Sequence, residues 1–525
     1  MGLQEEIAKR KTFGIISHPD AGKTTLTEKL LLFGGAIQVA GAVKAKKASR
    51  HATSDFMEIE KQRGISVATS VMGFEYKNFK INLLDTPGHQ DFSEDTFRTL
   101  TAVDSAIMVI DATKGVETQT HKLMEICRLR NIPTMTFMNK LDREGRDPIE
   151  LLDEIEDKLQ VTVCPLSWPI GMGKSFKGVY NILQKSLTLF KAHQKQDTVD
   201  NIQITNLADP KLDELLGSQA DKLREDIELV CGVYPKFNRD DYLAGHLTPI
   251  LFGSALNNFG VQELLDCFIQ YAPGPKPRET DIKEIIPESD KFTGFIFKIH
   301  ANIDPKHRDR IAFLRICSGV FERNKWIYNA RSDKKFKCSN PTAFMAQDKT
   351  VIDTAYPGDI IGLHDTGRLK IGDSLTDGEK LNFKGIPCFS PEIFKYAVNL
   401  EPLKTKQLTK GLAQLCEEGV AQYFKKLNSA QVIVGTVGVL QFDVIQYRLQ
   451  NEYGASCRFD SMEYIKACWV SSVDENKLNS FIKNRSTQIA LDKDERPVYL
   501  AETRWSLDRE IKENPEINFH STSEF

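Results

Sequence analysis

The 525-residue sequence lacks any apolar run long enough to cross a bilayer, and it has no apolar segment near its amino terminus that would direct secretion. It also lacks a myristoylation signal, because Glu6 stands where that signal needs Ser or Thr. Its ten cysteines form no Cys-x-x-Cys pair and show no metal-like spacing, as is typical of reduced thiols in a cytosol. We therefore expect a cytoplasmic protein with no membrane contact.

An excess of charge of either sign is missing as well, since 69 Lys and Arg stand against 72 Asp and Glu. The whole chain is therefore not a binder of polyanions, and any contact with RNA must come from local, salt-sensitive patches. The basic run Lys44–Lys47 with Arg50 is one such patch, although runs of this kind usually form a solvated surface. The length allows three or four domains, each with its own core.

What the sequence does contain is four short motifs, each directly after an apolar, strand-like run. They are Ser-His-Pro-Asp-Ala-Gly-Lys-Thr at 17–24, Asp-Thr-Pro-Gly-His at 85–89, Asn-Lys-Leu-Asp at 139–142 and Ser-Ala-Leu at 254–256. Any one of them could arise by chance. All four in this order predict a guanine-nucleotide switch that binds and hydrolyses GTP.

The first motif predicts a phosphate-binding loop between a buried strand and a helix. Backbone N–H groups of residues 20–24 can converge on phosphates at the helix N-terminus. Lys23 would reach the outer phosphates, and the Thr24 hydroxyl would hold Mg²⁺. Ser17 replaces the usual first glycine, and the alternative is a helix start that merely reads Gly-Lys-Thr. The predicted nucleotide-binding residues here are Asp20, Ala21, Gly22, Lys23, Thr24 and Thr25.

The second motif predicts the γ-phosphate sensor and the catalytic residue. Asp85 ends a strand and can hold Mg²⁺ through a water, while the Gly88 N–H can contact the γ-phosphate. His89 follows directly and is the predicted catalytic residue, which would orient the attacking water. The alternative for His89 is a solvated loop histidine. His18 and His51 have no such context and are assigned to structure or surface.

The third and fourth motifs predict the choice of base. Asp142 can accept hydrogen bonds from guanine N1–H and its 2-amino group, which adenine does not offer. Asn139 can contact another base edge, and the stem of Lys140 can lie over the ring. Ser254, Ala255 and Leu256 follow a last strand and would supply a backbone N–H to guanine O6. GTP and GDP are therefore the expected ligands, and ATP is not.

The segment Arg63-Gly64-Ile65-Ser66 resembles the Arg-Gly-Ile-Thr segment of translational GTPases. The resemblance implies that the Ser66 hydroxyl completes the Mg²⁺ shell formed with Thr24 and Asp85. It also implies a hydrophobic gate beside the catalytic histidine, with Pro19 and Ile65 in the matching positions. Proline is stiffer and shorter than the aliphatic residue that is usual there.

The domain organisation follows from changes in pattern along the chain. Residues 1–272 are expected to form an α/β P-loop GTPase domain with a helical insertion at about 143–245, whose 168–179 segment looks like elongation factor G. Residues 273–290 form a Pro-rich linker. Short strands between Gly-rich turns at 291–386 predict an antiparallel β-barrel that resembles the second domain of translational GTPases.

Residues 387–525 alternate strand-like and helical patterns, which predicts an α+β ferredoxin-like domain. Its Gly438–Val444 segment resembles the third domain of bacterial peptide-chain release factor three, the class II release factor. Elongation factor G usually has a different, Gly-Glu-Leu-His-like sequence at this place. The resemblance to release factor three covers essentially the whole chain.

This resemblance implies a ribosome-dependent GTPase of translation termination that uses GTP to remove class I release factors after peptide release. Its partners would be the ribosome, both rRNA and ribosomal proteins, and class I release factors with or without direct contact. Off the ribosome a monomer is expected. The sequence shows no arginine finger of its own, which fits hydrolysis completed when the ribosome orders His89.

Several alternatives stay open at this point. A translocase of the elongation factor G type would need further domains beyond Phe525. A stress GTPase or another ribosome-bound regulator shares the motifs and differs mainly in the C-terminal part. A GTP-dependent scaffold with little hydrolysis is a non-enzymatic alternative. A P-loop kinase is disfavoured because it has no use for Asn139–Asp142.

Overall fold

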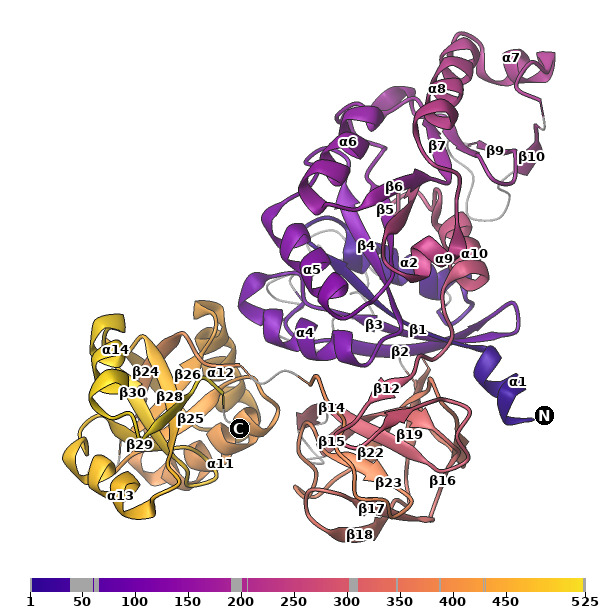
Figure 1. The fold of residues 1–525 in the computed structure, drawn as a ribbon. Coiled ribbons are helices and arrows are strands. Elements are labelled where there is room, and N and C mark those ends of the chain that lie inside the picture. The colour runs from indigo at the N-terminus through magenta and orange to yellow at the C-terminus, as the bar shows by residue number, and fades with distance from the viewer. Residues whose placement is uncertain are drawn as a thin grey trace.

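The protein is described from a computed structural model, which covers residues 2–37, 60, 66–189, 201–204, 206–301, 310–345, 348–386, 389–427, 429 and 431–522. Figure 1 shows the course of the chain from indigo at the N-terminus to yellow at the C-terminus. The predicted gate residue Ile65, the basic run at 44–50 and His51 lie outside the described residues.

The N-terminal region is built on a mostly parallel sheet, as the four motifs predict. Its strands, in spatial order, are β2 (Ser70–Tyr76), β3 (Phe79–Asp85), β1 (Arg10–Ser17), β4 (Ser105–Asp111), β5 (Thr134–Asn139), β11 (Leu247–Phe252) and β6 (Thr162–Pro165). All neighbouring pairs are parallel except β2 with β3. Strands β1, β4, β5 and β11 are buried along their whole length, because helices cover both faces of the sheet.

Alternate residues of β4 show how the two faces are covered. Ile107 and Val109 pack in one cluster with Leu26 of α2 (Lys23–Phe33) and Leu264 of α10 (Val261–Tyr271). The intervening β4 residues point to the other face, which is covered by α5 (Thr118–Leu129) and α6 (Pro148–Leu159). Further helices described in this region include α1 (Leu3–Ala8), η1 (Gln90–Phe92), α4 (Ser93–Thr101) and α9 (Arg239–Leu243).

The insertion contains a small sheet in addition to its helices, so its description as helical is incomplete. Its helices include α7 (Pro210–Leu216) and α8 (Gln219–Val233). The sheet consists of β7 (Ser167–Ile170), β8 (Gly178–Asn181), β9 (Ser186–Leu189) and β10 (Asn201–Gln203), with η2 (Gly173–Ser175) between β7 and β8. Strands of three or four residues are too short to show a period of two in the sequence.

The second region is the expected curled antiparallel β domain. Its longer strands are β14 (Thr293–Ala301), β15 (Arg310–Ser318), β17 (Trp326–Asn329), β18 (Lys334–Lys337), β19 (Thr342–Met345), β20 (Asp348–Val351), β22 (Ile360–His364) and β23 (Ser374–Thr376). Short strands form two further pairs, β12 (Arg278–Glu279) with β13 (Glu284–Ile285), and β16 (Phe321–Glu322) with β21 (Thr354–Ala355). A bridge between Met345 of β19 and Gly73 of β2 joins this sheet to that of the N-terminal region.

The C-terminal region consists of two successive β-α-β-β-α-β units. The first is β24 (Ile393–Asn399), α11 (Thr405–Glu417), β25 (Gln422–Lys426), β26 (Val432–Thr436), α12 (Val439–Tyr453) and β27 (Cys457–Ser461), with η3 (Pro402–Lys404) before α11. The second is β28 (Lys466–Ser471), α13 (Glu475–Asn484), β29 (Ile489–Leu491), β30 (Pro497–Ala501), α14 (Arg504–Glu513) and β31 (Asn518–His520).

The strand order of each unit is that of a ferredoxin-like fold, and β25 pairs with β29 to join the units into one eight-stranded antiparallel sheet. The expected ferredoxin-like domain is therefore present, and the arrangement occurs twice.

Buried ion pairs connect the first two regions. Arg10 Nε of β1 lies 2.9 Å from the Asp359 carboxylate, and Arg315 of β15 lies 2.6 Å from Asp104, which precedes β4. Each region thus contributes one arginine and one aspartate. Because separating such a pair would leave buried charges unpaired, these contacts hold the two regions in one relative position.

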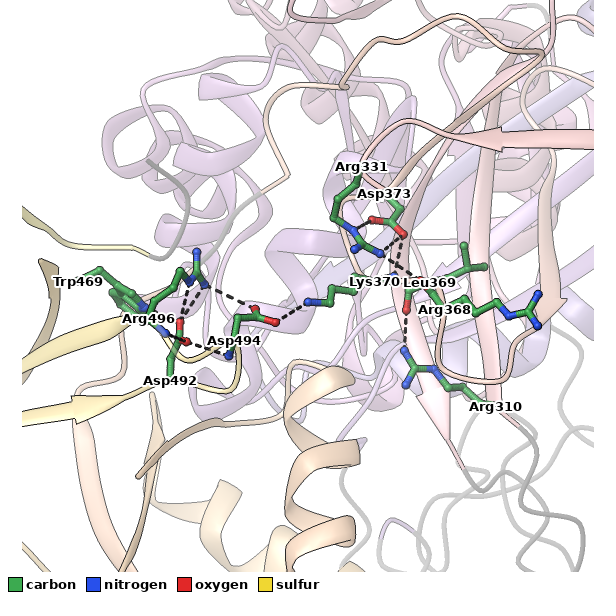
Figure 2. A network of polar contacts seen from close by, with 10 residues as sticks. All are labelled: Arg310, Arg331, Arg368, Leu369, Lys370, Asp373, Trp469, Asp492, Asp494 and Arg496. Atoms are coloured by element: carbon green, nitrogen blue, oxygen red, sulfur yellow. Dashed lines mark hydrogen bonds and ion pairs between the residues drawn. The ribbon is translucent and has the colours of Figure 1, made fainter. Parts of the chain in front are cut away.

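The second and third regions meet through both buried and exposed contacts. The Glu418 carboxylate accepts a hydrogen bond from Ala301 N at 3.0 Å and lies 2.7 Å from Arg448. Burial raises the pKa of Glu418, while Arg448 opposes that rise. Figure 2 shows an exposed contact, in which Lys370 Nζ lies 2.6 Å from the Asp494 carboxylate in the turn between β29 and β30.

Within the described residues, no helix combines the length and the apolar composition that crossing a membrane requires.

Candidate nucleotide site

The loop between β1 and α2 has the geometry of a phosphate-binding loop. Asp20 and Gly22 adopt left-handed backbone conformations, with φ of 64° and 99°, which turn the chain sharply into the helix. Gly22 caps α2 without a side-chain hydrogen bond, so the first N–H groups of the helix are open to an anionic ligand. Lys23 is buried, and Thr24 and Thr25 are half-buried in the first turn.

Lys23 and Asp85 meet at the carboxyl ends of β1 and β3. Lys23 Nζ forms an ion pair with Asp85 Oδ1, and the two side chains are 5% and 1% exposed. The other oxygen, Asp85 Oδ2, is buried and has no hydrogen-bond partner among the described residues. An orphaned carboxylate oxygen beside the Thr24 turn fits a divalent cation held through water, so the residues present suit Mg²⁺.

The segment after β3 packs directly on the phosphate loop. Thr86 Oγ1 donates to Ile15 O at 2.8 Å, which ties the start of this segment to β1. A Cβ on Gly88 would lie 3.4 Å from Pro19 Cα, so Gly88 lies close against the phosphate loop. The structure therefore brings Pro19 next to Gly88.

His89 is half-buried and makes a local contact. Its Nδ1 accepts a hydrogen bond from Asp91 N at 3.2 Å, so the ring caps the short helix η1. Its edge also faces the Phe92 ring, with 6.2 Å between the ring centroids. His89 thus caps η1 from the position directly before it.

Ser66 is half-buried, and the Glu60 carboxylate anchors the two residues that follow it. Glu60 Oε1 accepts hydrogen bonds from Val67 N at 2.8 Å and from Ala68 N at 3.1 Å. Glu60 is fully buried, and its position had no sequence signal beyond its place in a charged run.

Asn139 joins the phosphate loop to the Ser-Ala-Leu loop. Its Nδ2 donates to Ala21 O and its Oδ1 accepts from Ala255 N, both at 2.9 Å. From the sequence, Asn139 is expected at a base edge and the loop at 254–256 near guanine O6. The structure gives Asn139 a second role, because its side-chain amide connects the two loops. The Ala255 N–H donates to this amide.

Asp142 and Lys140 lie on the same edge of the sheet. The Asp142 carboxylate accepts a hydrogen bond from Ser254 Oγ at 2.5 Å, which fixes its orientation. Lys140 Nζ contacts Asp20 O and lies 2.7 Å from Asp111 Oδ2. Burial raises the pKa of Asp111, but hydrogen bonds from Lys140 and Thr113 outweigh it and hold the pKa below its usual value. Leu256 is 64% exposed.

Sequence reasoning missed Asp111, Glu60 and Asp91 as contributors to this site. Asp111 ends a buried strand at the carboxyl edge of the sheet, a position that could have identified it. Glu60 and Asp91 act through contacts that no local pattern reveals.

The region that carries this site matches a known protein family. The family model of the elongation factor Tu GTP binding domain matches residues 8–274, about half of the chain. The chain belongs to the translational GTPases. Proteins with this domain hydrolyse GTP, so this GTPase binds guanine nucleotides and is an enzyme.

The rest of this translational GTPase matches two further families. Elongation factor G domain 2 matches residues 291–378, and the C-terminal domain of the class II release factor RF3 matches residues 383–510. Together the three matches make it an RF3-type translational GTPase related to elongation factor G, and a factor of this type interacts with the ribosome.

A solved structure supports the fold. The crystal structure of ttk003000868 from Thermus thermophilus aligns with a TM-score of 0.70 at 20% sequence identity. The alignment covers 88% of this GTPase and 70% of the Thermus chain.

Proposed function

We propose that this GTPase acts in translation termination, where it promotes dissociation of class I release factors from the ribosome after peptide release. The observation that carries the proposal is the match of residues 383–510 to the C-terminal domain of the class II release factor RF3. This region packs on the segment that follows His89, where Leu440 N donates to the Asp91 carboxylate at 2.8 Å. A C-terminal region in contact with the nucleotide switch is what a GTP-dependent release step requires.

GTP and GDP bind through the phosphate loop and the Asn139–Asp142 loop. The N–H groups of residues 20–25 and Lys23 hold the phosphates, and Gly88 senses the γ-phosphate. Thr24, Ser66 and Asp85 would hold Mg²⁺, which would neutralise the charge of the phosphate oxygens. The free oxygen of Asp85 and the position of Thr24 in the first turn of α2 support this assignment.

Guanine is selected by Asp142, whose carboxylate accepts hydrogen bonds from N1–H and the 2-amino group. Ser254 orients that carboxylate, and Asn139 and Lys140 hold the surrounding loops in place. Ser254, Ala255 and Leu256 form the side of the pocket near guanine O6.

His89 orients the attacking water, and Pro19 and Ile65 gate its approach. The ribosome, through its rRNA and proteins, stimulates hydrolysis by ordering His89. Class I release factors are functional partners, with or without direct contact. The GTPase works as a monomer off the ribosome, in the cytoplasm where ribosomes translate.

The proposed domains are a GTP-binding domain at 1–272, a linker at 273–290, a β-barrel at 291–386 and an α+β domain at 387–525. The proline run Pro273, Pro275 and Pro277 supports the linker. Another ribosomal GTPase role, in elongation or stress, is the second candidate, since the family of the GTP-binding domain is shared among such factors.

A recycling assay separates these candidates. Peptide release from an excess of termination complexes is measured with a class I factor at limiting concentration. We expect this GTPase with GTP to convert one round of release into many rounds. Lys23→Ala should abolish the effect, whereas Lys122→Ala, which changes an exposed lysine of α5, should preserve it. A single round of release in the presence of active GTPase would favour the second candidate.

A further inference from the structure

Helix α12 begins with its own Gln441 Oε1 accepting hydrogen bonds from Val437 N and Gly438 N, both at 2.9 Å, whereas its N-cap position offers no side chain. Its N-cap residue is Gly438, although Ser, Thr, Asp and Asn are the residues that usually satisfy the first N–H groups of a helix. Instead, Leu440 N donates to Asp91 Oδ2 at 2.8 Å, across 349 residues of sequence. A carboxylate of the GTP-binding domain therefore caps a helix of the C-terminal region, and its negative charge suits the positive end of the helix dipole.

The close approach of the two regions depends on Gly438. A Cβ at this position would overlap the Cβ and Cγ atoms of Asp91. Its φ of −123° is an ordinary extended conformation, so glycine is needed for space and not for backbone freedom. Around this contact, Val67 and Phe92 pack against Val444 of α12 in a small apolar cluster.

Asp91 also holds the proposed catalytic histidine. The Asp91 N–H donates to His89 Nδ1 at 3.2 Å, and Asp91 Oδ1 lies 3.3 Å from the same nitrogen. One residue thus contacts His89 with its backbone and α12 with its side chain.

The adjoining helix α4 is anchored in the same way, so the segment is held from both other regions. Arg98 Nη2 donates to Gly419 O, beyond the end of α11, at 3.0 Å. Lys298 Nζ of β14 lies 2.8 Å from the Asp95 carboxylate. A displacement of the C-terminal region would therefore act on residues 91–98 directly.

We propose that Asp91 is a positioning residue for GTP hydrolysis, which keeps His89 in its helix-capping position as long as α12 docks on the Asp91 carboxylate. When the C-terminal region leaves Asp91, η1 loses this support and His89 becomes free to turn toward the attacking water. Docking of α12 thus restrains hydrolysis off the ribosome. This inference rests on the proposed role of His89 in orienting the water.

Gly438→Ala tests the inference from the side of the C-terminal region, without altering the GTP-binding domain. We expect the ribosome-independent kcat for GTP to rise about fivefold with KM unchanged, because one helix cap is worth about 1 kcal/mol, which corresponds to that factor. Val439→Ala is the matched control at the next position, where the side chain is 55% exposed, and should leave the rate unchanged. An unchanged or lower kcat in Gly438→Ala would overturn the inference.

Asp91→Ala tests the same contact from the other side and keeps the inference falsifiable if one variant folds poorly. Both substitutions remove the same contact between Asp91 and Leu440 N. The double variant should therefore have the same kcat as each single variant, and additive increases in kcat would contradict a shared mechanism. His89→Ala added to Gly438→Ala should abolish the gain. If His89→Ala alone leaves ribosome-stimulated hydrolysis intact, the proposed role of His89 fails. If His89→Ala lowers ribosome-stimulated hydrolysis but Gly438→Ala does not raise the ribosome-independent kcat, the role of His89 stands and only the restraint by α12 fails.

Discussion

Arg315 of the β domain and Asp104 of the GTP-binding domain lie 2.6 Å apart, and their side chains are 1% and 0% exposed. Asp104 also lies 3.1 Å from Arg278 of β12. A single carboxylate therefore balances two arginines at the junction of the two regions. Burial lowers the pKa of Arg278, and Asp104 opposes that change.

We expect Asp104→Ala to destabilise the protein by about 3–5 kcal/mol, because it leaves Arg315 and Arg278 without their shared partner. Urea unfolding of purified variants measures this loss. Asp494→Ala is the matched control, since its pair with Lys370 is partly exposed (Figure 2) and such pairs contribute about 1 kcal/mol or less. Equal losses in the two variants would contradict the role given to the buried pair.

Asp142→Asn should change the base preference of the pocket from guanine to xanthine. An amide can donate to the 2-oxo group of xanthine, whereas it cannot accept both hydrogen bonds that guanine offers. We expect GTP affinity to fall by about 100-fold or more and xanthosine triphosphate to bind in its place. Competition between labelled GDP and each nucleotide measures the change, and unaltered GTP affinity would show that the base site is wrongly assigned.

Glu94→Gln should change how stability depends on pH. Burial raises the pKa of Glu94 to about 7, Arg98 opposes the rise, and Asp95 and Glu392 add to it. Between its ordinary pKa near 4.5 and 7, the folded state holds a proton that the unfolded state has lost, so the wild type loses stability as pH rises through this window.

A glutamine stays neutral, so the difference in Tm between Glu94→Gln and the wild type should grow by a few degrees from pH 4.5 to 7 and then level off. Thermal unfolding at a series of pH values measures it. A constant difference across the range would contradict the burial of this carboxylate in the folded protein.

His89→Ala should lower ribosome-stimulated kcat by about 100- to 1,000-fold and leave KM for GTP unchanged, because a residue that orients the attacking water acts in the transition state. Phosphate release in the presence of ribosomes measures both parameters. His121→Ala, an exposed histidine of α5, serves as the control. Full activity of His89→Ala would remove His89 from the mechanism.

The elements that carry the nucleotide site were predictable because their sequence signals are local. The apolar run before Ser17 becomes β1, the Gly-Lys-Thr turn becomes the start of α2, and Asp85 ends β3, each at its expected place. The four motifs then meet at one edge of the sheet because parallel strands bring their carboxyl ends together.

Contacts between distant residues were not predictable from the same signals. Asn139 bonds to Ala21 and Ala255, which are 118 and 116 residues away, and Asp91 caps α12 from 349 residues away. Both side chains are common polar residues whose partners depend on how separate elements pack. The second β-α-β-β-α-β unit was not predicted for another reason. Its strands β29 and β31 have three residues each, which is too short for an alternating pattern to be recognised in the sequence.

The proposal that this GTPase removes class I release factors is tested most directly by the dissociation rate of a labelled class I factor from post-termination ribosomes. We predict that dissociation becomes at least about tenfold faster with this GTPase and GTP, which corresponds to about 1.4 kcal/mol in the barrier. The acceleration should be absent with Lys23→Ala. No acceleration, with ribosome-stimulated GTP hydrolysis intact, would contradict the proposed role in termination.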